Sequence, residues 1–247
     1  MMEEKPLVRA VDRALDVLLC FAKEKELSLT EIAQRTSLHK STVHRLLASL
    51  EHKGFVARDP VTEKYRLGLR IWELSANLLG GDDPASILLP EMERLRDLLG
   101  ETVSLYIRDG LERVRVQAVQ SLQEIRRVAP VGVRMPLFVG ASSKVLVAFG
   151  DPELAEEVLA DPSCPPGLNR EQFRQQLAEI RRLGYATSVE EREPGAAAVA
   201  VPVFGRSNRL VAALCVSGPS NRMTLDVMRD QAPRLMEAAR RMKSMLD

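Results

Sequence analysis

The chain has 247 residues, of which 45% are hydrophobic and 28% charged, a balance typical of folded globular proteins that excludes a disordered chain. This length suits two domains of ordinary size. The formal net charge of only +1 excludes a strong general attraction to polyanions, so any such contact must come from a local charge pattern.

Three helices are predicted in the first part of the chain. Apolar residues within 7–23 recur at spacings of three, four and seven, which indicates an amphipathic helix. A second helix over 28–36 opens with the capping-box pattern S-x-x-E. A short break separates it from a third helix over 39–53, which we expect Gly54 to end because glycine tolerates positive φ.

A hairpin is predicted directly after the third helix. Residues 55–58 and 64–67 are typical of short strands, and Asp59-Pro60 between them is typical of a tight turn. This order of elements is that of a winged helix-turn-helix. We therefore assign residues 1–68 to a DNA-binding domain of this kind.

A linker is predicted where the composition changes. A helix is expected over 69–79, and Gly80-Gly-Asp-Asp-Pro84 follows it as the strongest break in the chain. We assign 69–82 to a linker helix and 83–247 to a second domain.

The second domain mixes predicted helices and strands. Helices are expected over 86–99, 142–149, 152–160, 170–183 and 224–245. Strands are expected over 102–107, 113–119, 124–129, 197–204 and 210–217. The last two are apolar runs joined by a short turn, so they should form a buried hairpin. The fold class predicted for this domain is α+β.

The third predicted helix carries a basic, polar face. Residues 1–70 contain 13 Lys and Arg against 10 Asp and Glu, which a solvated helix face explains as well as DNA contact. Small hydroxyls allow a helix to approach the major groove closely, and arginine reaches a guanine edge or a phosphate. The candidate DNA-contacting residues are Ser28, Lys40, Ser41, Thr42, His44 and Arg45, with Lys64 and Arg66 on the wing.

Both halves of the chain resemble one family. LTEIAQRTSLHKSTVHRLLASLEHKGFV and YRLGLRIWELS resemble the DNA-binding domain of IclR-family bacterial regulators. The second half resembles that family's GAF-like effector domain through Leu183-Gly-Tyr-Ala, Glu190-Glu191, Glu193-Pro-Gly195, Pro202-Val-Phe204 and Val216-Ser-Gly-Pro219. The resemblance covers nearly all of 7–245. It implies a six-stranded sheet, a homodimer or homotetramer, a double-stranded DNA operator and a small-molecule effector.

The resemblance also implies where the effector binds. Carried over by motif, the effector-binding residues are Ala141, Ser142, Ser143, Ser188, Glu190, Ala198, Cys215 and Ser217. A loop that feeds a helix N-terminus offers unpaired N–H groups to a carboxylate, so we expect an organic acid or aromatic effector. Several relatives have ionisable residues where this chain has Phe138, Ser188 and Ala198, so we expect a less ionisable pocket.

Other functions remain open from the sequence. The second domain of a constitutive DNA-binding repressor would only oligomerise. An enzyme is not expected, because the S-x-x-K match at Ser37 lacks S-D-N and K-T-G, and no catalytic residue is assigned. Three scattered cysteines predict neither disulfide nor metal site, and no cofactor is expected. The absence of a signal peptide or a membrane-spanning run predicts a cytoplasmic protein without a membrane partner.

Overall fold

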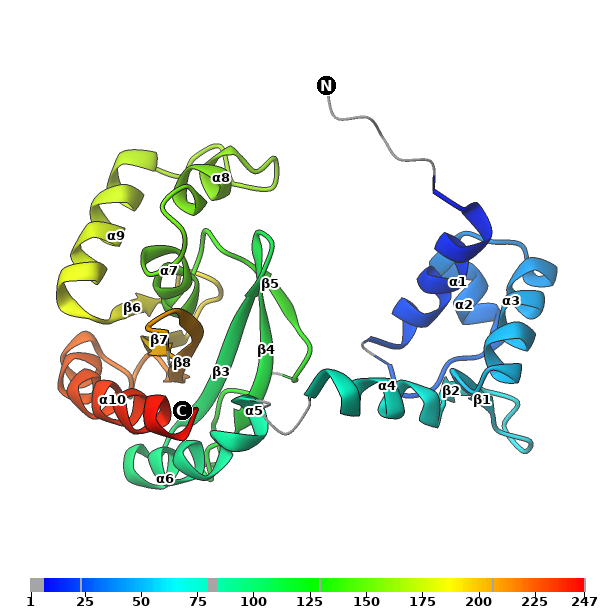
Figure 1. The fold of residues 1–247 in the computed structure, drawn as a ribbon, viewed down its shortest axis with the longest axis horizontal. Coiled ribbons are helices and arrows are strands. Elements are labelled where there is room, and N and C mark those ends of the chain that lie inside the picture. The colour runs from blue at the N-terminus through cyan, green and yellow to red at the C-terminus, as the bar shows by residue number, and fades with distance from the viewer. Residues whose placement is uncertain (1–6, 23, 80–83, 129, 206, 247) are drawn as a thin grey trace. The chain divides into compact units, whose positions relative to one another are not determined.

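The computed structural model describes residues 7–22, 24–79, 84–128, 130–205 and 207–246. The chain divides into two compact units, Met1–Gly81 and Asp82–Asp247, and each is described by itself (Figure 1). The predicted linker signal at 80–83 lies outside the described residues.

The first unit is a winged helix-turn-helix, as predicted. Its helices are α1 (Arg9–Leu19), η1 (Cys20–Ala22), α2 (Leu29–Thr36), α3 (Lys40–His52) and α4 (Leu69–Leu79). The wing consists of β1 (Val56–Arg58) and β2 (Tyr65–Leu67), which pair antiparallel. Its core joins the helices to the wing through buried side chains that include Val17, Ile32, Val43, Leu47, Val56 and Tyr65.

The turn chemistry in this unit follows the sequence closely. Ser28 and Glu31 form the predicted capping box at the start of α2. Ser37, between α2 and α3, adopts the left-handed conformation with φ 53°, which turns the chain between the two helices. Gly54 has φ 76°, and Asp59 Oδ1 accepts hydrogen bonds from the backbone N–H groups of residues 61 and 62 to fix the wing turn.

The second unit is built on a six-stranded antiparallel sheet in the order β5-β4-β3-β8-β7-β6. The strands are β3 (Thr102–Asp109), β4 (Glu112–Val119), β5 (Arg134–Pro136), β6 (Ala186–Val189), β7 (Ala196–Phe204) and β8 (Leu210–Pro219). The helices are α5 (Pro84–Ile87), α6 (Leu89–Leu99), α7 (Ala141–Ala148), α8 (Leu154–Ala160), α9 (Arg170–Leu183) and α10 (Leu225–Met245).

Helices cover both faces of this sheet (Figure 1). α6 and α10 pack on one face through a core that includes Val103, Leu105 and Leu214. α7, α8 and α9 pack on the other through a core that includes Tyr106 and Cys215. Because alternate residues of a strand point to opposite faces, Tyr106 and Cys215 lie on the α7 side.

Three sequence predictions for this unit need correction. Residues 124–128 do not form a strand, since 124 and 125 are bends and 126–128 are irregular, and Ala129 lies outside the described residues. The single helix predicted over 86–99 is two helices, α5 and α6. The short edge strands β5 and β6 were not predicted, because three or four residues give too few alternations to detect.

Candidate functional site

α3 presents a polar face on the side away from the core of its unit. Val43 and Leu47 are buried on its inner side. Four predicted DNA-contacting side chains, Lys40, Ser41, His44 and Arg45, are exposed. Among the described residues, no hydrogen bond or ion pair engages the side chains of Lys40, His44 or Arg45. These three side chains therefore have their donors available to a partner.

One of the predicted hydroxyl groups caps a helix and another contacts a cap. Ser28 Oγ lies 2.7 Å from Glu31 Oε2 in the capping box of α2. His39 is the N-cap of α3, and its Nδ1 lies 2.7 Å from Ser41 Oγ and accepts from Ser41 N. Thr42 is half-buried. A phosphate contact by Ser28 would therefore share the group that caps α2.

The wing adds two exposed cations. Lys64 and Arg66 are exposed, and no side-chain partner for either lies among the described residues. Arg58 differs, because it pairs with Glu63 at 2.8 Å and its guanidinium lies 5.8 Å from the centre of the Tyr65 ring. The charge of Arg58 is therefore used within the wing.

In the second unit, a small cavity lies on the α7 side of the sheet, where α7 begins. We call it the inner cavity, and its volume is about 50 Å³. Six of the eight predicted effector-binding residues line it, namely Ala141, Ser142, Ser188, Ala198, Cys215 and Ser217. The register explains this grouping, because Ser217 pairs with Ala198 and Ala198 pairs with Ser188 across three adjacent strands.

The other two predicted residues do not line the inner cavity. Ser143 is fully buried behind it, where its hydroxyl donates to the backbone oxygen of Pro136 at 2.9 Å. Glu190 lies in the exposed loop after β6 with φ 53°, and its carboxylate accepts from Ser220 Oγ and the Gly195 N–H. The structure thus gives Ser143 and Glu190 local structural contacts.

The expectation of a less ionisable pocket did not take account of the charged residues that line the inner cavity. Four arginines line the inner cavity, namely Arg113 and Arg115 of β4, Arg127 of the β4–β5 connection and Arg192 of the β6–β7 loop. None was a candidate from the sequence. They make the inner cavity strongly electropositive.

Arg113 is held among neutral groups. It is 3% exposed, and its Nη1 donates to the Val139 carbonyl oxygen at 2.8 Å and contacts Ser143 Oγ. Its Nε has no hydrogen-bond partner within the described part of the chain. Burial lowers the pKa of the Arg113 guanidinium, which shows that its charge is poorly compensated where it lies.

Tyr106 lies against two of the arginines. The centre of its ring is 5.2 Å from the Arg113 guanidinium carbon and 5.1 Å from that of Arg115. Its hydroxyl accepts from Arg115 Nε at 3.0 Å. The negative face of an aromatic ring stabilises a nearby cation, so Tyr106 lets two guanidinium groups share one region of the sheet.

The remaining groups of the inner cavity are neutral donors. Ser217 is 8% exposed, and its hydroxyl lacks a hydrogen-bond partner among the residues the structure describes. α7 begins at Gly140 without a side-chain cap. Burial raises the pKa of the Cys215 thiol and so favours its protonated form.

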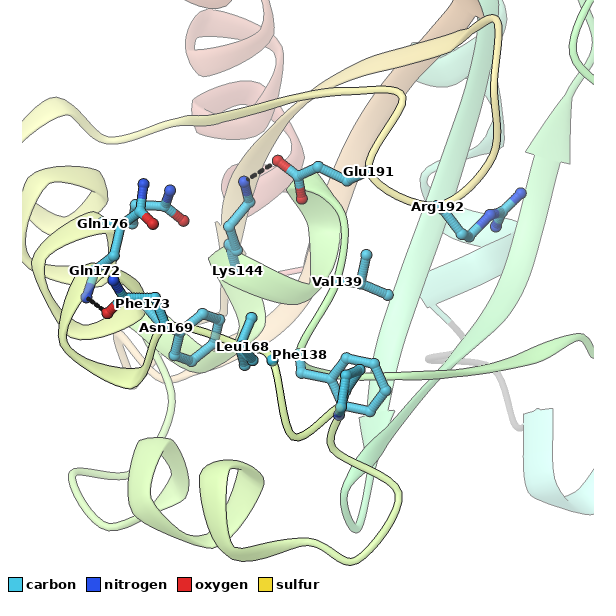
Figure 2. A pocket seen from close by; sticks show the side chains of 12 residues that line it. Phe138, Val139, Lys144, Leu168, Asn169, Gln172, Phe173, Gln176, Glu191 and Arg192 are labelled. Carbon is cyan, nitrogen blue, oxygen red and sulfur yellow. Dashed lines mark hydrogen bonds and ion pairs between the residues drawn. The ribbon is translucent and has the colours of Figure 1, made fainter.

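A second, larger pocket of about 620 Å³ lies beside the inner cavity, between α7 and α9 (Figure 2). Its apolar wall includes Phe138 and Phe173, and Gln172 and Gln176 face it from α9. We call it the outer pocket. Arg192 lines both the outer pocket and the inner cavity.

A partly buried ion pair lies on the wall of the outer pocket. Lys144 Nζ of α7 is 2.5 Å from Glu191 Oε1, as Figure 2 shows, and Glu191 Oε2 accepts from the Gly140 N–H at 3.1 Å. The Lys144 side chain is only 7% exposed. Glu191 thereby ties the β6–β7 loop to the start of α7.

Family models match both units of the chain. The IclR helix-turn-helix domain matches residues 10–60, and the bacterial transcriptional regulator IclR C-terminal domain matches residues 78–244. The two units together are those of a bacterial transcriptional regulator that binds DNA through a helix-turn-helix. The chain belongs to the IclR family.

Named relatives agree with this assignment. The chain is 32% identical to the HTH-type transcriptional regulator KdgR of Dickeya chrysanthemi, over 94% of this chain and 78% of that protein. It is 34% identical to the regulator XynR of Escherichia coli K12, over 88% and 89% of the two chains. These relatives are regulators rather than enzymes.

Solved structures share the fold. An IclR homologue from Microbacterium hydrocarbonoxydans in complex with 4-hydroxybenzoate superposes with a TM-score of 0.83, at 27% identity over 96% of this chain and 98% of that one. The IclR protein of Thermotoga maritima has a TM-score of 0.76, at 28% identity over 96% and 98% of the two chains. Within the described residues, no helix is long and apolar enough to cross a membrane.

Proposed function

We propose that this regulator binds its operator through α3 and the wing, and that a small organic acid in the inner cavity controls this binding. The observation that carries the proposal is the pair of buried polar atoms in the inner cavity, Arg113 Nε and Ser217 Oγ, that have no partner among the described residues. Buried polar groups are nearly always hydrogen-bonded, so such atoms call for a ligand or ordered water.

The DNA half of the proposal rests on α3 and the wing. The exposed side chains of Lys40, His44 and Arg45 share one face of α3, and Lys64 and Arg66 add positive charge on the wing. A recognition helix reads base edges while cations outside it contact phosphates. Ser28, Ser41 and Thr42 would add short hydroxyl contacts to the backbone of the DNA.

The effector half rests on the electropositive inner cavity. Its arginines favour an anion, because guanidinium groups stabilise negative charge. The Microbacterium hydrocarbonoxydans relative is complexed with an aromatic acid, which supports the same broad class of effector here. Ala141, Ser142, Ser188, Ala198 and Cys215 would form the walls around the ligand.

We also propose that the regulator acts as a homodimer or a dimer of dimers. Val11, Leu15 and Leu19 are exposed at a spacing of four residues along α1, and Trp72 of α4 is 72% exposed. An exposed apolar stripe of this kind marks a protein–protein contact. A two-fold dimer would present two recognition helices to an operator with two-fold symmetry.

The substitution Ser217→Phe tests the link between ligand and DNA. A phenyl ring at this position fills the inner cavity, so we expect loss of the response to organic acids with little change in affinity for the operator. The measurement is fluorescence anisotropy with a DNA duplex selected by the full-length protein, titrated with and without candidate acids. Ser163→Phe, at an exposed position in the α8–α9 connection, is the matched control.

Two outcomes contradict the proposal. Loss of both DNA affinity and response in Ser217→Phe, with the control unaffected, would mean that Ser217 belongs to the core rather than to a ligand site. Operator affinity that no organic acid changes in the wild-type protein would favour a constitutive repressor whose second unit only oligomerises.

A further inference from the structure

We infer that the ligand of the inner cavity is a compact dicarboxylate, with two negative charges rather than one. This inference rests on the proposed effector function and specifies the chemical class of the effector. It comes from the balance of charge, the hydrogen-bonding needs and the size of the inner cavity.

The first step is the isolation of Arg113. No carboxylate among the described residues forms an ion pair with it, and its guanidinium contacts a carbonyl oxygen, a hydroxyl and the Met135 sulfur. A buried charge is costly unless it is paired and hydrogen-bonded. Arginine stays protonated in proteins, so the missing negative charge has to come from elsewhere.

The second step concerns two further arginines. Arg127 and Arg192 both form ion pairs with Glu193, so they share a single carboxylate. Arg192 also contacts the Met135 sulfur that Arg113 contacts, which places these two guanidinium groups near each other. Thioether sulfur is a weak acceptor and does not neutralise either of them.

The charges then leave a defined excess. Glu191 is already neutralised by Lys144, so it does not compensate the arginines. Arg115 donates to the Tyr106 hydroxyl and has other contacts, so we do not include it in this count. The three guanidinium groups of Arg113, Arg127 and Arg192 share the one carboxylate of Glu193. Two positive charges remain uncompensated at the cavity wall. A ligand with two negative charges would balance them, whereas a monoanion would leave one.

The third step is size. A volume of about 50 Å³ accommodates only a few ligand atoms, since one water needs roughly 10–15 Å³ on this scale. Most ligand pockets measure about 300–1,000 Å³. The inner cavity is thus too small for an aromatic ring that also carries a carboxylate, and it suits a short carbon chain. Two carboxylates provide enough acceptors for the free donors Arg113 Nε and Ser217 Oγ together with the guanidinium edges.

Isothermal titration calorimetry of the full-length protein tests this inference. The probes are oxalate, malonate and succinate, each compared with its mono-amide (oxamate, malonamate and succinamate), which has nearly the same shape and one charge fewer. We expect at least one diacid to bind roughly tenfold or more tightly than its mono-amide, the ratio that corresponds to about 1.4 kcal/mol. Pyruvate, 4-hydroxybenzoate and inorganic phosphate complete the panel.

Variants connect the preference to the arginines. In Arg113→Met the stem is kept and the charge removed, so the ratio of diacid to mono-amide affinity should fall towards one. The melting temperature should be unchanged or higher, because an isolated buried charge is replaced by an apolar group. Arg192→Gln should lower the ratio too. Arg174→Met, which breaks an exposed ion pair with Glu156 on α8, is the control and should keep the wild-type ratio.

The outcomes separate the two proposals. Equal or tighter binding of mono-amides, pyruvate or 4-hydroxybenzoate would overturn the dicarboxylate inference while the proposed effector function stands. Inorganic phosphate that binds more tightly than every diacid would overturn it in the same way. A panel in which no anion binds would overturn both.

Discussion

Single side chains in the two units differ in how their charge is held. Arg45 on α3 is exposed and has no side-chain partner among the described residues, so binding to DNA has no internal contact to break. Arg113 on β4 is buried among neutral acceptors and carries a charge that the fold does not balance. We therefore propose that the first arginine contacts a large polyanion and the second a small anion that enters the protein.

The prediction at Arg45 concerns operator affinity. Arg45→Ala should weaken specific binding by about 1–3 kcal/mol if the side chain makes a bidentate contact with a base. A phosphate contact would instead weaken binding to all sequences. It would also reduce the slope of log affinity against log salt concentration by about one. The measurement is a fluorescence titration of operator and scrambled duplexes at several salt concentrations. Arg182→Ala, an exposed arginine of α9, makes the same change in net charge, and equal affinity of both variants would remove Arg45 from the interface.

The sequence predicted the small residues of the inner cavity but not its arginines. The small residues Ala198 and Ser217 were assigned from the resemblance to the family, and they pair with each other in the observed register. The arginines could not, because the alternation R-V-R-V at Arg113–Val116 shows that two faces differ but not that both are covered. Helices pack on both faces of this sheet, so the polar face of β4 is buried under the α7 layer. One feature of the sequence could have identified these arginines. They are charged residues within a predicted strand, and both faces of its sheet could be covered by helices.

Among the elements, those with long periodic patterns or local turn chemistry were predictable. α9 begins and ends where the sequence indicates, because Asn169 caps its start and Gly184 its end. The prediction of a strand over 124–128 was wrong. A strand needs a pairing partner from another part of the sheet, and the local sequence does not show whether one is present. The neighbours of this segment supply a different contact instead, since the Thr102 hydroxyl donates to the Arg127 carbonyl oxygen at 2.8 Å.

An ion pair between two helices leads to a prediction about pH. Glu91 of α6 is 8% exposed and accepts hydrogen bonds from Arg94 and, across to α10, from Arg241 at 2.8 Å. Burial acts to raise the pKa of Glu91, but the hydrogen bonds from the two arginines outweigh it and hold that pKa below its usual value. Glu91→Gln should lower the free energy of unfolding near neutral pH by about 1–2 kcal/mol, since both arginines are partly exposed.

The sign of the pH effect follows from the lowered pKa in the folded state. The contribution of Glu91 is fully present above the pKa of an unfolded glutamate, about 4.3, and is lost as the pH falls through the lower folded value. Urea unfolding at several pH values should show the difference between wild type and Glu91→Gln shrinking in acid. Glu237→Gln removes the exposed partner of the same arginine and should cost less than about 0.5 kcal/mol. A difference that grows in acid would contradict this account.

For the whole molecule, a ligand in one unit must change what the other unit does. A ligand shifts an equilibrium only by as much as it binds one arrangement better than another. The β6–β7 loop is a candidate for that sensitivity, because Arg192 lines the inner cavity and pairs with Glu193, while Glu191 holds the start of α7. A dicarboxylate that draws Arg192 inward would alter the contacts of the whole loop.

The last prediction concerns assembly and its effect on DNA binding. Leu15 is 53% exposed in the middle of the apolar stripe of α1, so Leu15→Glu places a charge in the proposed dimer contact without disturbing the core of the unit. We expect light scattering to show a smaller assembly, and operator affinity to fall about 10²-fold or more, because simultaneous binding to two half-sites is lost. Affinity for a single half-site should be unchanged. Leu98→Glu on α6, with a side chain of similar exposure, is the control, and an unchanged assembly in Leu15→Glu would exclude α1 from the contact.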